Sequence, residues 1–269
     1  MAANALNADR PAMAGASLAG RHVVVTGAGQ GIGAAIVRAL AAQGACLTLM
    51  GRRLAPLQAL AAQLPASAAS VSVDVADEAA VQQAFAAARD AHGPVALLIN
   101  NAGQAESAPF AKTSLALWQR LLAVNLTGTF LCTQQALPDM LAAGHGRVVN
   151  IASTAGQRGY AYVSAYVAAK HGVVGLTRAL ALEMATKGIT VNAVCPGYTD
   201  TEILRDSIAK VVAKTGRTAA QARAAFEQSN PQGRLVQPDE VAQAVMWLCS
   251  DAAAAITGQC LSVSGGEVM

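Results

Sequence analysis

Tyr166 and Lys170 stand one helical turn apart in the segment 164–186, whose pattern predicts an amphipathic helix. Side chains at this spacing lie on one helical face, so the phenol and the ammonium would be neighbours. A nearby cation favours the phenolate, and we expect it to lower the pKa of Tyr166 toward working pH. Such a tyrosine can give a proton to a forming alkoxide or take one from an alcohol. The pair would therefore suit proton exchange with an alcohol or a forming alkoxide, although this spacing also arises by chance on many helices.

Ser153 follows an apolar run at 147–151 that is typical of a buried strand. Open parallel sheets bind ligands beyond the carboxyl ends of their strands, which is where this serine would lie. Its hydroxyl could hold the reacting oxygen while that oxygen gains charge. We therefore expect both Ser153 and Tyr166 to contact substrate.

The glycine-rich segment 26–33 (TGAGQGIG) directly follows the first apolar run and opens a helical pattern. Glycines permit a tight turn and let backbone N–H groups approach a pyrophosphate. The start of the helix adds free donors and a partial positive charge. The segment predicts a dinucleotide phosphate site formed by Gly27, Gln30, Gly31, Ile32 and Gly33.

The end of the second apolar run bears on which nicotinamide is bound. An NAD site usually offers an acidic side chain there to the ribose 2′-hydroxyl, but this run ends in MGRR (50–53). A guanidinium can pair with a 2′-phosphate that a carboxylate would repel. We expect NADP(H), held by Arg52 and Arg53. NAD(H) stays the alternative, because Gln30 is not basic and the two arginines could simply be solvated at a helix start.

Asp74 and Val75 end the third apolar run and are candidate cofactor contacts. The carboxylate of Asp74 could accept a hydrogen bond from an adenine amino group. It could instead cap the helix expected from Glu78. Both interpretations stay open.

Short apolar runs alternate with longer amphipathic stretches from His22 onward. Most runs are continuous and β-branched, as in parallel strands buried on both faces. The alternation predicts a single Rossmann-type α/β domain over 18–269, with a doubly wound parallel sheet. The expected strands are 22–26, 46–50, 70–73, 95–99, 147–151, 190–194 and 259–263, and the clearest helices are 31–43, 78–91, 115–143 and 164–186.

A polar excursion of helical pattern, at about 200–232, leaves the expected carboxyl edge of the sheet, where long loops often serve as substrate lids. A surface hairpin without a role is the alternative. Arg205, Lys210 and Lys214 within it could meet a phosphopantetheine or coenzyme A phosphate, or could form a solvated helix face.

Composition excludes several classes of partner. The 269 residues are 54% hydrophobic and 13% charged, with a net charge of +3 and no basic block, which argues against nucleic acid as a partner.

Five scattered cysteines predict reduced thiols and no metal site. Residues 1–17 are interpreted as a flexible tail rather than a signal peptide, and no apolar stretch is long enough for a membrane span. We expect a cytoplasmic protein.

Taken together, the motifs resemble the short-chain dehydrogenase/reductase family over nearly the whole chain from Ser17 onward. The family's TGxxxGIG stands at 26–33 and its NNAG at 100–103. The resemblance implies a seven-stranded sheet of order 3-2-1-4-5-6-7 with three helices on each side. It also implies that Asn125 helps hold a water between the lysine and a proton relay, within a catalytic tetrad of Asn125, Ser153, Tyr166 and Lys170.

The resemblance also completes the cofactor site. The family's proline–glycine segment is followed here by Tyr198-Thr199-Asp200-Thr201. By analogy the two threonines contact the carboxamide and phosphate region, and Lys170 bonds the nicotinamide ribose. The cofactor contacts implied in this way are Asn101, Ala102, Gly103, Tyr166, Lys170, Pro196, Gly197, Thr199 and Thr201.

Several segments, including 164–183 and 188–197, resemble bacterial polyketide ketoreductases and 3-oxoacyl thioester reductases. The implied reaction is NADPH-dependent reduction of a 3-oxoacyl thioester or similar ketone, with Tyr166 as the acid. Substrate identity would depend on the lid and on 157–162, where Gln157 and Tyr160 are candidate contacts. We also expect a homodimer or homotetramer, formed by the helices around 113–142 and 164–187, as in the family.

Two alternatives stay open. One is an NAD-dependent dehydrogenase of a 3-hydroxyacyl-CoA or another secondary alcohol, against which the missing acid after the second run weighs. The other is a non-catalytic nucleotide-sensing protein on the same fold. Such a protein would be expected to have lost part of the tetrad, whose four positions are intact here.

Overall fold

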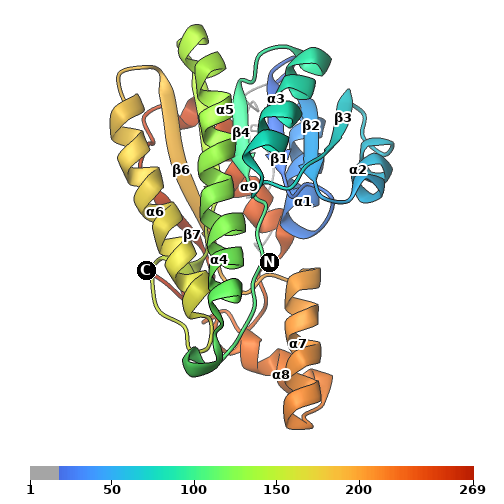
Figure 1. The fold of residues 1–269 in the computed structure, drawn as a ribbon, viewed down its shortest axis with the longest axis vertical. Coiled ribbons are helices and arrows are strands. Elements are labelled where there is room, and N and C mark those ends of the chain that lie inside the picture. Colours follow the sequence, from blue (N-terminus) through green and yellow to red (C-terminus); the bar gives the residue numbers. More distant parts are fainter. Residues whose placement is uncertain (1–17) are drawn as a thin grey trace, which may run out of the picture.

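The computed structural model describes residues 18–269, and a seven-stranded parallel sheet lies at their centre (Figure 1). Its order, β3-β2-β1-β4-β5-β6-β7, confirms the expected topology and fold class. The predicted tail, 1–17, lies outside the described residues. The strands are β1 (His22–Thr26), β2 (Cys46–Gly51), β3 (Ala68–Ser72), β4 (Leu97–Asn100), β5 (Gly146–Ile151), β6 (Ile189–Pro196) and β7 (Cys260–Val263).

Helices cover both faces of the sheet (Figure 1). On one face, α1, α2 and α9 pack with Val25 and Ile99 into one apolar core. On the other, α3, α5 and α6 pack with Val24 and Leu98 into a second. Successive strand residues enter opposite cores because their Cβ atoms alternate. The helices are α1 (Gly31–Ala42), α2 (Leu54–Ala61), α3 (Glu78–His92), α4 (Leu115–Leu122), α5 (Gly128–Ala143), α6 (Ser164–Met184), α7 (Glu202–Thr215), α8 (Ala219–Glu227) and α9 (Pro238–Cys249), with 3₁₀ turns at Phe110–Lys112, Thr154–Gly156 and Asp251–Ala253.

Burial explains why the central strands could be recognised. β1, β4, β5 and β6 are buried along their whole length, so their sequences are almost continuously apolar. The edge strands β3 and β7 are only partly buried and carry polar residues.

The third strand differs from its predicted range. β3 ends at Ser72, so Asp74 and Val75 follow the strand. The N-cap of α3 is Asp77, whose carboxylate accepts a hydrogen bond from the N–H of Ala80. The interpretation of Asp74 as the helix cap is therefore wrong.

The predicted helix over 115–143 is interrupted by a π-helical turn, Ala123–Thr127, which contains Asn125. Such turns are rare and often occur at functional sites. By length and hydropathy this segment is long enough to cross a bilayer. Within the protein, α5 packs on the sheet, and Leu131 and Met140 belong to the core, while 33% of the apolar window as a whole is buried.

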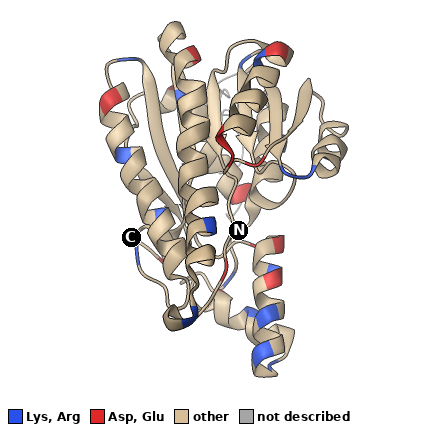
Figure 2. Ribbon diagram, in the orientation of Figure 1, with Lys and Arg blue, Asp and Glu red and all other residues tan. Residues whose placement is uncertain are grey.

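The predicted excursion folds as a helical hairpin. α7 and α8 contact each other and project from the end of β6 at the bottom of Figure 1. Thr218 and Gln221 form a capping box that starts α8. Figure 2 shows acidic residues on α7 at the end nearer the sheet and basic residues toward its other end.

Candidate active site

A cavity of about 1250 Å³ opens at the carboxyl edge of the sheet. Its walls come from the loop after β1, the ends of β2, β4, β5 and β6, the start of α6, and one face of α7. Every predicted site residue except Gln157 lines this cavity. Folding therefore gathers motifs that are far apart in the sequence around a single space.

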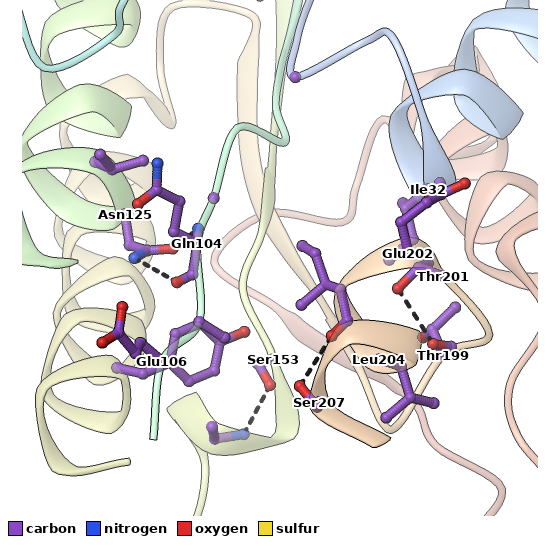
Figure 3. Close-up of a pocket in the computed structure, with 18 of the residues that line it drawn as sticks. Ile32, Gln104, Glu106, Asn125, Ser153, Thr199, Thr201, Glu202, Leu204 and Ser207 are labelled. Atoms are coloured by element: carbon purple, nitrogen blue, oxygen red, sulfur yellow. Dashed lines mark hydrogen bonds between the residues drawn. The ribbon is translucent and has the colours of Figure 1, made fainter. Parts of the chain in front are cut away.

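Ser153 and Tyr166 meet on one wall of the cavity. Ser153 follows β5 and accepts a 3.1 Å hydrogen bond from the N–H of Ala155. Tyr166 lies in the first turn of α6, and the nearby Ser153 side chain acts to lower the pKa of its hydroxyl. Two adjacent hydroxyls in a cavity can act on the same oxygen atom of a ligand. Figure 3 shows Ser153 between the Asn125 side and the α7 side of the cavity.

Burial governs the titration of Tyr166. It raises the pKa of the Tyr166 hydroxyl above its ordinary value, and the nearby Ser153 side chain offsets only part of this increase. The expected lowering of this pKa is not found for the protein's own groups, in which burial has the largest effect. Near neutral pH the hydroxyl is protonated, which is the form that donates a proton.

Lys170 is buried, with 4% of its surface exposed. Its ammonium donates a 2.7 Å hydrogen bond to the carbonyl of Ile151 at the end of β5. The same ammonium lies 5.7 Å from the centroid of the Tyr166 ring. Burial lowers the pKa of Lys170 to about 8. Its positive charge is therefore present at neutral pH and is lost in mildly alkaline solution.

Asn125 joins the π-helical turn to the segment after β4. Its amide nitrogen donates to the carbonyls of Gln104 (3.0 Å) and Leu121 (2.9 Å), and its amide oxygen accepts from the N–H of Gln104 (3.2 Å). Figure 3 shows Asn125 beside Gln104. A Cβ on Gly103 would lie 2.9 Å from that oxygen and 3.7 Å from the ammonium of Lys170. The amide thus positions the wall beside the lysine, and the water-holding role of Asn125 stays a prediction.

The start of α1 suits a phosphate. The helix has no side-chain cap, and Gly31, Ile32 and Gly33 line the cavity. The free N–H groups of a first helical turn and the positive end of the helix favour an anion there. A Cβ on Gly33 would lie 2.2 Å from the carbonyl oxygen of Gly27, so glycine is required for the loop to close on the helix. This cradle fits the pyrophosphate of a dinucleotide.

Arg52 and Arg53 border the cavity beside this cradle. Arg53 donates to the amide oxygen of Gln30, and Arg52 lies 3.0 Å from the side-chain amide group of Gln104. Neither guanidinium forms an ion pair with an acid within residues 18–269. Two exposed cations without acidic partners can pair with a ribose 2′-phosphate.

Asn101 fastens β4 to the glycine loop. Its amide nitrogen donates to the carbonyls of Thr26 and Gly27, both at 3.0 Å. The hydroxyl of Thr26 in turn accepts from the N–H groups of Asn101 and Ala102. Figure 3 shows Thr199 and Thr201 on the side of the cavity opposite Asn125. The other predicted cofactor contacts that line the cavity are Asp74, Val75, Gly103, Pro196 and Gly197.

The structure corrects the prediction for Gln157. Its amide nitrogen donates to the carbonyl of Cys260 (3.2 Å), and its amide oxygen accepts from the hydroxyl of Ser262 (3.0 Å). Both partners lie on β7, so this side chain holds the loop after Ser153 against the sheet. It does not line the cavity.

Tyr160 and Tyr162 both line the cavity. Tyr162 is 67% exposed and adopts a φ of 67°, which is strained for a residue other than glycine. Its carbonyl accepts a 2.8 Å hydrogen bond from the N–H of Ala108, which joins the two loops at the rim. Tyr160 was a candidate substrate contact in the sequence, and Tyr162 was not.

One wall was missed by sequence reasoning. The loop 104–109, Tyr198 and Phe226 all line the cavity. The position of Tyr198 beside the proline–glycine segment was a signal that could have identified it. The loop 104–109 carries no chemical motif, and only the path of the chain after β4 brings it there.

No group of three or more His, Cys, Asp or Glu side chains in the described part of the chain is arranged to hold a metal ion. The five cysteines are free.

Comparison with known proteins identifies the family and several relatives of this chain. The family model of short chain dehydrogenases matches residues 21–212. A putative ketoacyl reductase of the granaticin polyketide synthase of Streptomyces violaceoruber is 42% identical, with 90% of this chain and 91% of that protein covered. The cis-4-hydroxycyclohexanecarboxylate dehydrogenase of Sinomonas cyclohexanicum is 41% identical, with 94% and 98% covered. The crystal structure of an actinorhodin polyketide ketoreductase variant with NADPH matches with a TM-score of 0.89 at 38% identity, covering 92% of this chain and 97% of that one.

Proposed function

The chain belongs to the short-chain dehydrogenase family, and we propose that it reduces a ketone to a secondary alcohol with NADPH. The observation that carries this proposal is the neighbouring pair of hydroxyl residues, Ser153 and Tyr166, in a cavity that also contains the glycine cradle. Its similarity to ketoacyl reductases supports the direction of reduction. A protonated Tyr166 at neutral pH supports the same direction, because reduction consumes a proton.

The residues around the cavity have separate tasks in this reaction. Bound NADPH supplies the hydride that the ketone carbon accepts. Ser153 orients the ketone oxygen through its hydroxyl, and Tyr166 donates its proton to that oxygen as negative charge develops. The nearby cation of Lys170 favours the tyrosinate that remains after proton transfer. Asn125 keeps the wall beside the lysine in place.

The cofactor preference follows from charge. The glycine cradle would hold the pyrophosphate, and Arg52 and Arg53 would hold the 2′-phosphate that distinguishes NADPH from NADH. Both arginines lack acidic partners within residues 18–269, so their charge is free for a ligand. The actinorhodin ketoreductase structure contains NADPH, which supports this preference.

The substrate we favour is a 3-oxoacyl thioester carried on coenzyme A or a carrier protein. Lys210 and Lys214 line the cavity from α7, one helical turn apart, and form no ion pair with an acid of the described residues. Arg205, by contrast, pairs with Asp200 at 3.3 Å. The two lysines would meet a phosphate on the tail of the thioester. The hairpin α7–α8 would then act as the lid over that tail.

The relatives support one second candidate, oxidation of a secondary alcohol. The cis-4-hydroxycyclohexanecarboxylate dehydrogenase is almost as similar as the ketoacyl reductase. The same residues would serve, but Tyr166 would first have to lose its proton. Its raised pKa opposes this near neutral pH, which is why we place reduction first.

A substrate panel tests these proposals directly. Ketones, 3-oxoacyl thioesters and secondary alcohols are assayed with NADPH or NADP and with NADH or NAD. We expect the highest kcat/KM for a 3-oxoacyl thioester with NADPH at pH 7. Turnover of alcohols alone would favour the second candidate, and no turnover of any compound would contradict both.

We also infer that the chain forms a homodimer or homotetramer. Leu115, Phe130 and Leu141 of α4 and α5 and Leu182 of α6 are exposed apolar side chains on neighbouring helices of one layer. Covering such side chains in a symmetric interface would remove them from water. Sedimentation that shows a stable monomer at micromolar concentration would contradict this inference.

A further inference from the structure

Glu267, in the segment after β7, reaches back to the wall of the cavity. Its Oε1 lies 2.7 Å from the hydroxyl oxygen of Tyr160, which also lies 2.8 Å from Oγ1 of Thr154. A carboxylate only accepts hydrogen bonds, so Tyr160 donates to Glu267 and accepts from Thr154. The hydroxyl of Tyr160 is therefore engaged within the protein, and the ring is what this residue offers to a ligand.

Arg158 holds Tyr160 from a second side. Its guanidinium carbon lies 4.8 Å from the centroid of the Tyr160 ring, a cation–π distance. One nitrogen of the same guanidinium donates to the backbone carbonyl of Glu267 at 3.2 Å. Glu267 thus contacts the tip of Tyr160 and also the cation that covers its ring.

Tyr160 begins a row of aromatic rings along the cavity. Its ring packs edge-on against Tyr198 with 6.2 Å between centroids, and Tyr198 packs in the same way against Phe226 at 4.8 Å. All three residues line the cavity, and Phe226 belongs to α8 of the hairpin. A shift of Tyr160 would therefore move a continuous wall that extends to the proposed lid.

The position of the Glu267 carboxylate is unfavourable for the stability of the fold. Its second oxygen, Oε2, is buried and has no hydrogen-bond partner in the described part of the chain. A Cβ on Gly197 would lie 2.8 Å from that oxygen, so the carboxylate fits there only because residue 197 is glycine. Buried polar atoms without partners are uncommon and destabilising. A residue that only anchored the end of the chain would not need such a position.

The charge of Glu267 also affects the neighbouring phenols. Burial raises the pKa of Tyr160 and of Tyr198, and the carboxylate raises both further. Both phenols therefore remain neutral at working pH.

We propose that Glu267 is a positioning residue that fixes the aromatic wall of Tyr160, Tyr198 and Phe226 and thereby determines which ketones fit the cavity. The proposal rests on the proposed ketone reduction. It assigns no direct substrate contact to the carboxylate, which acts through the hydroxyl of Tyr160.

A double-mutant cycle tests this assignment. The ratio of kcat/KM for a bulky aryl ketone to that for a small aliphatic ketone is measured with NADPH for wild type, Glu267→Ala, Tyr160→Phe and the double variant. We expect each single variant to change the ratio about tenfold, mainly through KM, because a hydrogen bond to a charged group is lost. The double variant should show no further change, because both substitutions remove the same contact.

Conservative and remote variants complete the comparison. Glu267→Gln keeps an acceptor oxygen and should retain a selectivity within about threefold of wild type. Asp90→Ala removes an exposed carboxylate on α3 and serves as the matched control. An unchanged ratio in Glu267→Ala, or effects of Glu267→Ala and Tyr160→Phe that simply add, would overturn the proposal. A loss of thermal stability with unchanged selectivity would do the same.

A structural readout separates this proposal from the proposed function. Crystal structures of wild type and Glu267→Ala are compared at the three aromatic rings, which requires no turnover. We expect Tyr160 and Tyr198 to be displaced or disordered in the variant. Rings that keep their positions would refute the role of Glu267, even if ketone reduction is established. Absence of any ketone turnover by wild type would refute the proposed function alone.

Discussion

The ammonium of Lys170 donates a 2.7 Å hydrogen bond to the carbonyl oxygen of Ile151, the last residue of β5. This bond joins α6 to the strand end that precedes Ser153. Tyr166, one turn earlier on α6, is thereby held facing Ser153. The same contact draws the lysine into the protein, where burial lowers its pKa to about 8. The contact between the end of β5 and α6 thus fixes the position of Tyr166 beside Ser153 and also lowers the pKa of Lys170.

Removal of the Tyr166 hydroxyl should abolish proton donation. Tyr166→Phe keeps the ring, so we expect kcat for ketone reduction to fall by about 10²–10⁴-fold, the usual contribution of a general acid. The dissociation constant for NADPH, measured by nucleotide fluorescence, should stay within about threefold of wild type because the cradle is untouched. Tyr162→Phe, at the rim, is the matched control. Near-normal turnover of Tyr166→Phe would refute its assignment as the acid.

The rate of reduction should depend on the charge of Lys170. Below its pKa of about 8 the ammonium favours the tyrosinate left after proton transfer, and above it this help is lost. We therefore expect kcat/KM for the ketone to decline as pH rises through about 8, since this parameter reports the free enzyme. Lys170→Arg keeps a charge at all these pH values, so its residual activity should lack that decline. The same decline in Lys170→Arg would assign it to another group.

The choice of cofactor should depend on Arg52 and Arg53. Replacing both by Ala removes the cations that would pair with the 2′-phosphate, and we expect NADPH affinity to fall about 10–100-fold. NADH affinity should change little, because NADH lacks that phosphate. Arg38→Ala removes an exposed cation on α1 as the control. Equal losses for NADPH and NADH would show that the arginines act on the fold of the loop instead.

Lys210 and Lys214 of α7 should favour substrates whose tail carries a phosphate. For the double variant Lys210→Ala, Lys214→Ala we expect kcat/KM for a 3-oxoacyl-CoA to fall about tenfold, with a weaker dependence on salt. A small ketone without a phosphate should be reduced at the wild-type rate. Lys187→Ala, exposed just before β6, controls for net charge. If kcat/KM fell equally for the thioester and the small ketone, the two lysines would act on the folding of the hairpin rather than on binding of the thioester tail.

Much of the fold could be predicted because it depends on local patterns. β1, β4, β5 and β6 are buried on both faces, so continuous apolar runs identified them. β3, an edge strand with polar residues, begins two residues and ends one residue before its predicted range, and the helix cap is Asp77 rather than the candidate Asp74. The π-helical turn around Asn125 left no sign in the apolar periodicity, since it changes the backbone without changing which residues are apolar.

The sequence by itself identified the glycine cradle, the four residues of the predicted tetrad and the absence of an acid after β2, because each depends on residue types at particular positions. The tertiary structure alone decided how these groups behave. It turned Gln157 onto β7, raised the pKa of Tyr166 through burial, and brought Glu267 from the end of the chain to Tyr160. Burial and contacts between distant segments arise only when the chain is packed, so no local pattern could have revealed them.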